Sequence, residues 1–97
     1  PPFTYLLQIS LSSSDEEKLD DTIVTLKETI QKTLGEDVTV IGPSIPLYQI
    51  IKTIHERNLI VKYTNYFRIK PKLLTILRPI NENSLFKVKI NIDPFDI

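Results

Sequence analysis

The chain has 97 residues, of which 41% are hydrophobic and 25% charged, and its formal net charge is zero. A chain of this length hides roughly 60 to 65% of its unfolded surface on folding, which suits one core and leaves too little for two. With no cysteines, a disulfide framework, a zinc ribbon and a thiol nucleophile are all excluded within this sequence.

No apolar run approaches the roughly 20 residues that a membrane helix needs, so we expect no membrane contact. The sequence opens on Pro1-Pro2-Phe3, with neither an initiator methionine nor a basic leader. We therefore expect residues 1–97 to be a single domain excised from a longer, soluble, intracellular protein.

Alternating apolar residues from Phe3 to Leu11 predict a first strand over residues 3–11. A capping box follows, with Ser13 or Ser14 three residues before Glu16 or Glu17. Apolar residues then recur at intervals of three and four, which predicts an amphipathic helix over residues 15–34. Gly35 is well placed to end this helix in a left-handed conformation.

Residues 38–41 are apolar except for Thr39 and predict a short strand that Gly42-Pro43 stops. Two further runs, residues 47–54 and 57–64, are rich in Ile, Leu, Val and Tyr. We expect them to form a hairpin that turns at His55-Glu56-Arg57.

Pro71 can occupy the first turn of a helix, where its missing N–H costs nothing, and Pro79 can end that helix. A second helix is therefore predicted between these prolines. Residues 86–92 alternate cleanly between apolar and polar side chains, as a strand with one buried face does. The element order is βαββαβ, which predicts an α+β, ferredoxin-like sandwich with an antiparallel sheet and two helices on one face.

The zero net charge hides a division along the chain. Residues 1–42 carry three basic and eight acidic side chains, a net charge of −5, whereas residues 43–97 carry nine basic and four acidic ones, a net charge of +5. Such asymmetry can position a polyanion against one side of a domain.

The sequence contains little that indicates a catalytic or metal-binding site. His55-Glu56 resembles the start of a zinc-protease motif, but Leu59 stands where the second histidine belongs. The acidic run from Asp15 to Asp21 lies in the first turns of a helix, where carboxylates complement the helix dipole. With two glycines in the chain no phosphate-binding P-loop can form, and the sole histidine lacks the partners of a catalytic triad. We expect no enzyme activity and no bound cofactor in this chain.

A basic set with interleaved aromatic residues has the side chains needed for phosphate contact and base stacking. Its aromatic members are Tyr48, Tyr63, Tyr66 and Phe67. The alternative interpretation is ordinary surface charge, with several tyrosines packed in the core. The predicted nucleic-acid contacts are Lys52, His55, Arg57, Lys62, Arg68, Lys70 and Lys72.

Four stretches, read together, resemble one family, the C-terminal domain of the bacterial primosomal replication-restart helicase, or primosomal protein N′. They are Pro1-Pro2-Phe3-Thr4-Tyr5-Leu6, Val40-Ile41-Gly42-Pro43-Ser44-Ile45-Pro46, Leu59-Ile60-Val61-Lys62-Tyr63 and Ile90-Asn91-Ile92-Asp93-Pro94. The resemblance covers nearly the whole chain and implies a fold similar to that of ribosomal protein S10.

The resemblance also implies a parent protein that is an ATP-dependent 3′ to 5′ DNA helicase, which restarts stalled replication forks in the bacterial cytoplasm, at the nucleoid. ATP, Mg and Zn are then expected in the parent chain, upstream of this domain. Expected partners are single-stranded, duplex or forked DNA, other domains of the helicase, single-strand-binding protein and primosome proteins. The alternative is a scaffolding domain that orients the helicase lobes or contacts those proteins.

One departure from the family concerns the DNA contacts. Where the family carries a basic stretch of the form R-x-x-x-R-x-R, this chain keeps positive charge only at Lys52 and Arg57, and Glu56 opposes it. Because each lost phosphate contact weakens binding, we expect the isolated domain to bind DNA weakly.

Overall fold

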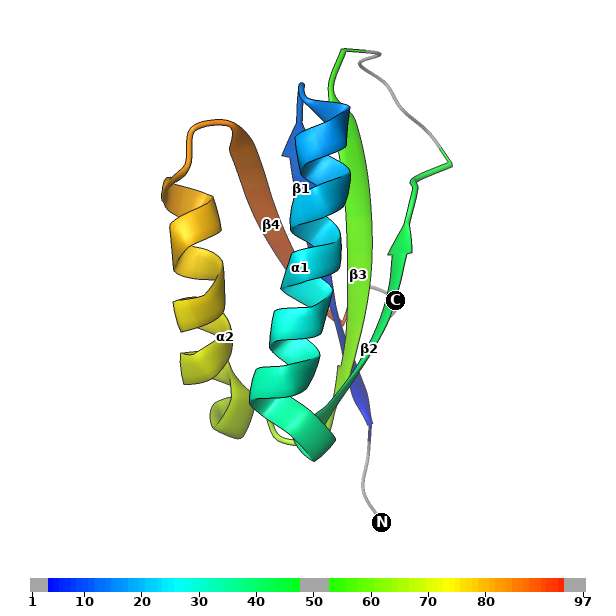
Figure 1. Ribbon diagram of the computed structural model, residues 1–97. Helices are drawn as coiled ribbons and strands as arrows, with labels where there is room; N and C mark the ends of the chain where they lie inside the picture. Colours follow the sequence, from blue (N-terminus) through cyan, green and yellow to red (C-terminus); the bar gives the residue numbers. More distant parts are fainter. Residues whose placement is uncertain (1–3, 48–52, 94–97) are drawn as a thin grey trace.

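The structure, a computed structural model, describes residues 4–47 and 53–93 of the chain. These residues form four strands and two long helices, whose arrangement Figure 1 shows. In chain order they are β1 (Tyr5–Ser13), α1 (Glu16–Leu34), a 3-10 turn (Gly35–Asp37), β2 (Val38–Ser44), β3 (His55–Tyr63), α2 (Tyr66–Glu82) and β4 (Phe86–Ile92).

The strands form one antiparallel sheet in the order β2-β3-β1-β4, and both helices pack on the same face of it (Figure 1). This arrangement confirms the predicted α+β, ferredoxin-like βαββαβ sandwich. No helix of the described residues lies on its other face.

Cross-strand partners divide the strand residues between the two faces, because directly opposed residues point the same way. Leu11 of β1 lies opposite Arg57 of β3 and Val88 of β4, on the side of the helices. The neighbouring row, Ser12 with Glu56 and Lys87, lies on the open side. The core is therefore the layer between the sheet and the helices, where the most deeply buried side chains are Leu7, Ile9, Leu11, Leu19, Ile23, Leu26, Ile30, Leu59, Ile69 and Val61.

Helix α1 confirms the predicted apolar stripe, since its five buried residues recur at intervals of three and four. The cap differs from the prediction by one or two positions. Asp15, and neither serine, caps the helix by accepting a 3.0 Å hydrogen bond from the backbone N–H of Lys18. Ser13 supports the turn before it by accepting a bond from the N–H of Asp15.

Strand β2 runs past the predicted stop, because a register shift lets the pairing with β3 resume beyond Gly42-Pro43. Gly42 has a φ of 116°, and a Cβ atom there would lie 2.9 Å from the backbone oxygen of Asn58. Lys27 of α1 holds this bend by donating from Nζ to the carbonyl of Gly42. Glycine is thus what lets the strand bend without ending.

The predicted turn at His55-Glu56-Arg57 is wrong, because these residues begin β3. They resemble a turn in being polar, yet their side chains alternate between the two faces of the sheet as strand residues do. The strand predicted over residues 47–54 lies mostly outside the described residues, and Leu47, Thr53 and Ile54 are not in a strand.

The predicted bounds of the second helix are also wrong, since α2 begins five residues before Pro71 and continues three residues past Pro79. Asn65 caps it by accepting a 3.3 Å hydrogen bond from the N–H of Arg68. Both prolines lie on exposed positions, while Ile69, Leu73 and Leu77 are buried. Burial of such side chains contributes about 1.5 to 3 kcal/mol each, which offsets the hydrogen bonds that the prolines remove.

Candidate functional site

The predicted nucleic-acid contacts fall in two separate places. His55 and Arg57 lie at the beginning of β3, whereas Lys62 lies near its other end. Arg68, Lys70 and Lys72 follow on the first two turns of α2. Lys52 lies outside the described residues.

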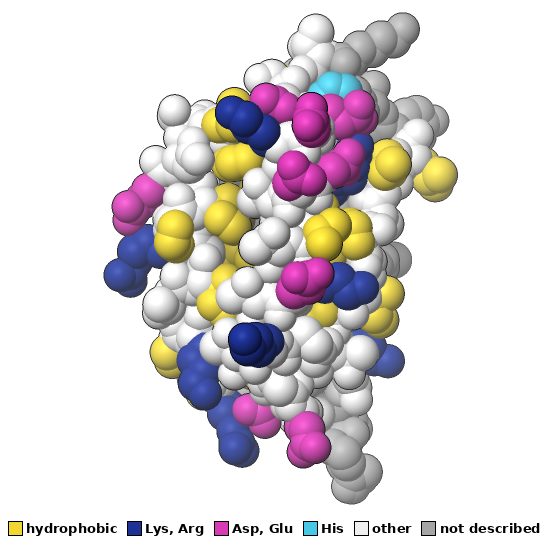
Figure 2. Space-filling model, viewed as in Figure 1, with side chains coloured by type: hydrophobic (Ala, Val, Ile, Leu, Met, Phe, Trp, Pro, Cys, Tyr) yellow, Lys and Arg dark blue, Asp and Glu magenta, His cyan; other side chains and the backbone are white. Residues whose placement is uncertain are grey.

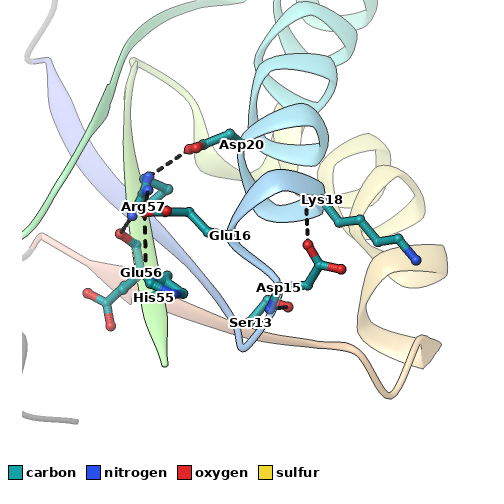
Figure 3. A network of polar contacts seen from close by, with 8 residues as sticks. All are labelled: Ser13, Asp15, Glu16, Lys18, Asp20, His55, Glu56 and Arg57. Carbon is teal, nitrogen blue, oxygen red and sulfur yellow. Dashed lines mark hydrogen bonds and ion pairs between the residues drawn. The ribbon is translucent and has the colours of Figure 1, made fainter. Parts of the chain in front are cut away.

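Arg57 points into the layer between the sheet and α1, as Figure 3 shows. The residue is 5% exposed, although it is charged. Its guanidinium donates from Nε to Oδ1 of Asp20 over 2.7 Å and from Nη2 to Oε2 of Glu16 over 2.9 Å. A third bond runs from Nη1 to the backbone oxygen of Glu56 over 2.9 Å.

These contacts explain how a buried cation is tolerated. Burial disfavours the charged form of Arg57. The hydrogen bonds that Arg57 donates to Asp20 and Glu16, and the negative charges of these carboxylates, outweigh that effect, so the pKa of Arg57 is raised. Arg57 therefore ties β3 to α1 and presents no cationic edge to solvent. Its role in the structure is to join two elements.

His55 belongs to the same polar cluster. Its Nδ1 lies 3.4 Å from Oε2 of Glu16, and its side chain is 24% exposed. Figure 2 shows this histidine beside a group of Asp and Glu side chains at the end of the molecule where α1 starts. A polyanion approaching His55 would meet those carboxylates.

The remaining four predicted residues lie at the opposite end, around the connection from β3 to α2. We call Lys62, Arg68, Lys70 and Lys72 the basic end. All four are exposed, and the side chain of Arg68 is 70% accessible even though its Nε lies 3.3 Å from Oδ2 of Asp37. Asp37 and Glu36 share a shallow hollow with Lys62, and they reduce the positive charge there.

The aromatic residues beside the basic end differ in exposure. Tyr63 is buried in the core, and burial raises the pKa of Tyr63, with the charges of Asp93, Tyr66 and Tyr5 adding to the rise. Phe67 is 85% exposed, with its ring centroid 6.1 Å from that of Tyr66. Nζ of Lys70 lies 5.7 Å from the centre of the Tyr66 ring.

An exposed phenyl ring next to cations can stack on a nucleobase while the cations hold its phosphates. In the sequence Phe67 is one of four aromatic residues near basic side chains, and nothing in their local pattern ranks them by exposure. The signal that separates them is Asn65, a favoured N-cap residue, because a helix that starts there directs Phe67 outward and Ile69 inward.

In the part of the chain that the structure describes, no group of three or more His, Cys, Asp or Glu side chains could hold a metal ion. No helix in residues 4–47 and 53–93 is long and apolar enough to cross a membrane.

A family model described as "Primosomal protein N C-terminal domain" matches residues 1–95. No curated protein sequence matches the chain.

Solved structures with the same fold share few identical residues with the chain. The de novo designed protein Foldit4 has a TM-score of 0.71 at 16% identity, over 93% of this chain and 96% of that one. The de novo designed protein LFR1 1, with a ferredoxin fold, has a TM-score of 0.59 at 13% identity, over 93% and 84%. The C-terminal DNA binding domain of the MHV-68 latency-associated nuclear antigen has a TM-score of 0.58 at 20% identity, over 95% and 74%. At these identities the likeness concerns the fold alone.

Proposed function

We infer the function from one premise, that the chain belongs to the primosomal protein N C-terminal domain family. It is a non-catalytic domain with a primosomal role. Beyond that, we propose that its parent protein is an ATP-dependent 3′ to 5′ DNA helicase that restarts stalled replication forks. In this proposal the domain contributes DNA contact to that helicase.

The observation that supports DNA contact best is Phe67, a large apolar side chain that is 85% exposed on the first turn of α2. Arg68 follows it directly, Lys70 lies three residues further along α2, and both are exposed. A stacked base contributes about 1 to 3 kcal/mol, and stacking requires an unpaired base. We therefore propose that the basic end and Phe67 bind single-stranded DNA, such as the unpaired arm of a fork, in preference to duplex.

Arg57 is not included in this proposed contact, since its donors are occupied by Asp20, Glu16 and Glu56. His55 is not included because it faces Glu16. We call this end of the molecule the acidic end, since α1 begins there with Asp15, Glu16, Glu17, Asp20 and Asp21. With four cations and two nearby carboxylates, Glu36 and Asp37, the basic end is expected to bind weakly on its own.

The rest of the proposal concerns the parent protein. We propose that its ATP, Mg²⁺ and Zn²⁺ sites lie outside residues 1–97 and that it acts in the cytoplasm, at the nucleoid. Its other proposed partners are the remaining helicase domains, single-strand-binding protein and primosome proteins.

Fluorescence anisotropy with labelled single-stranded, duplex and forked oligonucleotides tests the DNA contact. We expect single-stranded and forked DNA to bind more tightly than duplex, with affinity falling between about 50 and about 200 mM salt. Phe67→Ala is expected to weaken single-strand binding by about tenfold, which corresponds to one lost stacking contact. Lys70→Ala is expected to lower the slope of log affinity against log salt by about 0.7.

The matched control is Lys18→Ala, which removes one positive charge from an exposed site on α1, at the acidic end. If this variant weakened binding as much as Lys70→Ala, the attraction would be non-specific and the basic end would lose its role. Absence of binding to every oligonucleotide at about 50 mM salt would overturn the DNA-contact proposal itself.

A further inference from the structure

Among residues 4–47 and 53–93, strand β4 presents the regular free edge of the sheet. In the order β2-β3-β1-β4 the outer strands are β2 and β4. The pairing of β2 is interrupted by a register shift between Ile41 and Ser44, which breaks the regularity of its outer edge. By contrast β4 pairs with β1 over seven consecutive residues, Phe86–Ile92, with no shift and no proline. A regular unpaired edge is a template for another strand.

The backbone groups that this edge offers can be identified from one hydrogen bond. The N–H of Asp93 donates to the carbonyl of Leu6 over 2.8 Å, so this position directs its backbone polar groups toward β1. In an antiparallel pair, alternate residues direct these groups to opposite sides of the strand. Lys87, Lys89 and Asn91 therefore bond to β1. The donors and acceptors of Phe86, Val88, Ile90 and Ile92 face away from β1, where no described strand lies.

The side chains of these same residues lie on the helix side of the sheet, beside an apolar groove. The groove has a volume of about 400 Å³ and lies between β4 and α2, where it is lined by Leu74, Leu77, Arg78, Asn81, Val88 and Ile90. Leu74 is 45% exposed, Ile90 37% and Ile92 46%. A strand added to β4 would thus place every second side chain against apolar surface.

The side chains between them have the opposite character. Lys87 and Lys89 lie on the open side of the sheet, opposite Ser12 and Ser10, and both are exposed. Opposite charges directly across two strands stabilise the pairing, and like charges destabilise it. A residue facing either lysine from an added strand is therefore favoured when it is Asp or Glu.

Taken together, these features specify the sequence pattern of the occupant. We propose that the edge of β4 binds an extended segment of a partner protein in which apolar and acidic residues alternate. The segment adds a fifth strand to the sheet, with its apolar side chains toward α2 and its carboxylates toward Lys87 and Lys89. This goes beyond DNA contact and uses a different surface, since none of the basic end lies on β4.

A second copy of the chain fits this edge less well. Two copies related by a twofold axis would pair β4 with itself in antiparallel fashion. If the twofold axis passes through Val88, Lys87 of one copy lies opposite Lys89 of the other. If it passes through Lys89, the two copies of Lys89 lie opposite each other. An axis through Ile90 places Lys87 opposite Asp93, whose φ of 54° has left the extended conformation. The lysines thus disfavour self-association and still admit an acidic strand.

Binding of labelled peptides to the whole 97-residue chain tests the proposal. The probe is a peptide of about eight residues, the length of a strand, that alternates Val and Glu. Its controls are a peptide alternating Val and Lys, and a peptide of the same Val and Glu composition with the glutamates grouped at one end. We expect the alternating acidic peptide to bind at least about tenfold more tightly than either control, since two charge pairs change sign or fall out of register.

The charge-reversal variant K87E/K89E is expected to invert the preference, binding the basic peptide and losing the acidic one. Both positions are exposed, and a thermal melt checks that the variant folds. N-methylation of the acidic peptide at every second residue tests backbone pairing. Two such peptides are possible, methylated at the odd or at the even positions, and only one of them lacks the N–H groups that face β4.

Equal binding of the acidic and basic peptides, or equal effects of the two methylation patterns, would overturn the proposal. So would sedimentation showing a dimer that the acidic peptide does not dissociate, because the edge would then belong to a second copy. The variant Phe67→Ala is expected to keep full peptide affinity, which separates this surface from the basic end.

Discussion

Nε of Arg57 in β3 donates a 2.7 Å hydrogen bond to Oδ1 of Asp20 in α1, across the buried layer of the domain. The two partners differ sharply in environment, because the side chain of Arg57 is 6% exposed and that of Asp20 is 53% exposed. Losing the carboxylate would leave a cation buried without compensation, whereas losing the cation would leave a carboxylate that water can solvate. Arg57 therefore depends on Asp20 more than Asp20 depends on Arg57.

This asymmetry predicts unequal costs for removing the two sides. We expect the variant E16A/D20A to lower the free energy of unfolding by about 3 kcal/mol, because Arg57 stays buried with no anion beside it. Arg57→Met keeps the apolar stem and is expected to cost about 1 kcal/mol. Urea unfolding measures both values. The matched control is E17A/D21A, which removes the same charge from the first turns of α1 without touching Arg57; an equal loss there would show a helix-dipole effect alone.

Tyr63 predicts how stability changes at alkaline pH. Burial, together with Asp93 and the neighbouring tyrosines, raises the pKa of Tyr63 in the folded state above its ordinary value of 10.0. Above pH 10.0 the unfolded chain loses this proton while the folded chain keeps it, so the contribution of Tyr63 to stability falls as the pH rises. Below pH 10.0 the contribution is fully present.

The measurement is the urea midpoint of the wild type and of Tyr63→Phe between pH 8 and pH 11. Lysines also titrate in this range, and the comparison cancels their effect because both proteins carry the same lysines. We expect the stability of the wild type to fall relative to that of Tyr63→Phe as the pH rises past 10.0, since phenylalanine has no proton to lose. Parallel curves would show that the Tyr63 hydroxyl has the same pKa folded and unfolded.

Gly42 and Gly35 predict different costs for adding a methyl group. Both have positive φ, 116° and 55°, so each resists an L side chain. A Cβ at Gly42 would also lie 2.9 Å from the oxygen of Asn58, while at Gly35 it would meet nothing within 4 Å. We expect Gly35→Ala to cost about 1 kcal/mol and Gly42→Ala about 3 kcal/mol, because only the second adds a clash with backbone. Thermal unfolding ranks them, and equal losses would mean that β2 shifts to make room.

Local patterns in the sequence predicted the elements that depend on them. The stripe from Leu19 to Leu34 has the helical period over five positions, and β4 alternates over seven, so both were predicted within one residue. The start of β3 could not be predicted in this way, because His55-Glu56-Arg57 is polar and its contacts are with β1 and with carboxylates of α1, far away in the sequence. Asp20 is 37 residues from Arg57 in the sequence, and no local window contains both.

The same limit applied to the candidate site. All seven residues of the predicted set carry or can carry positive charge, and the sequence gives no reason to separate Arg57 from Lys70. The structure distinguishes the two residues. The sheet register turns Arg57 toward α1, and the Asn65 cap sets which face of α2 points outward. The exposure of Phe67 and the edge position of β4 likewise depend on the fold, so the sequence alone does not predict them.

Replacing Pro71 by alanine is expected to stabilise the protein, which is rare for a single substitution. Pro71 lies inside α2, where it cannot donate to the carbonyl of Phe67, and its ring is on the exposed side of the helix. Proline is about 3 kcal/mol less favourable than alanine within a helix, and its rigidity in the unfolded chain offsets about 1 kcal/mol of that.

Pro71→Ala is therefore expected to raise the free energy of unfolding by about 1 to 2 kcal/mol, measured by urea denaturation. The neighbouring change Lys72→Ala, also exposed, serves as the control and is expected to alter stability by less than about 0.5 kcal/mol. Because Thr75 donates to the backbone oxygen of residue 71, that bond survives in the alanine variant. A neutral or destabilising Pro71→Ala would mean that the first turns of α2 are held by the proline ring, and that the orientation of Phe67 depends on it.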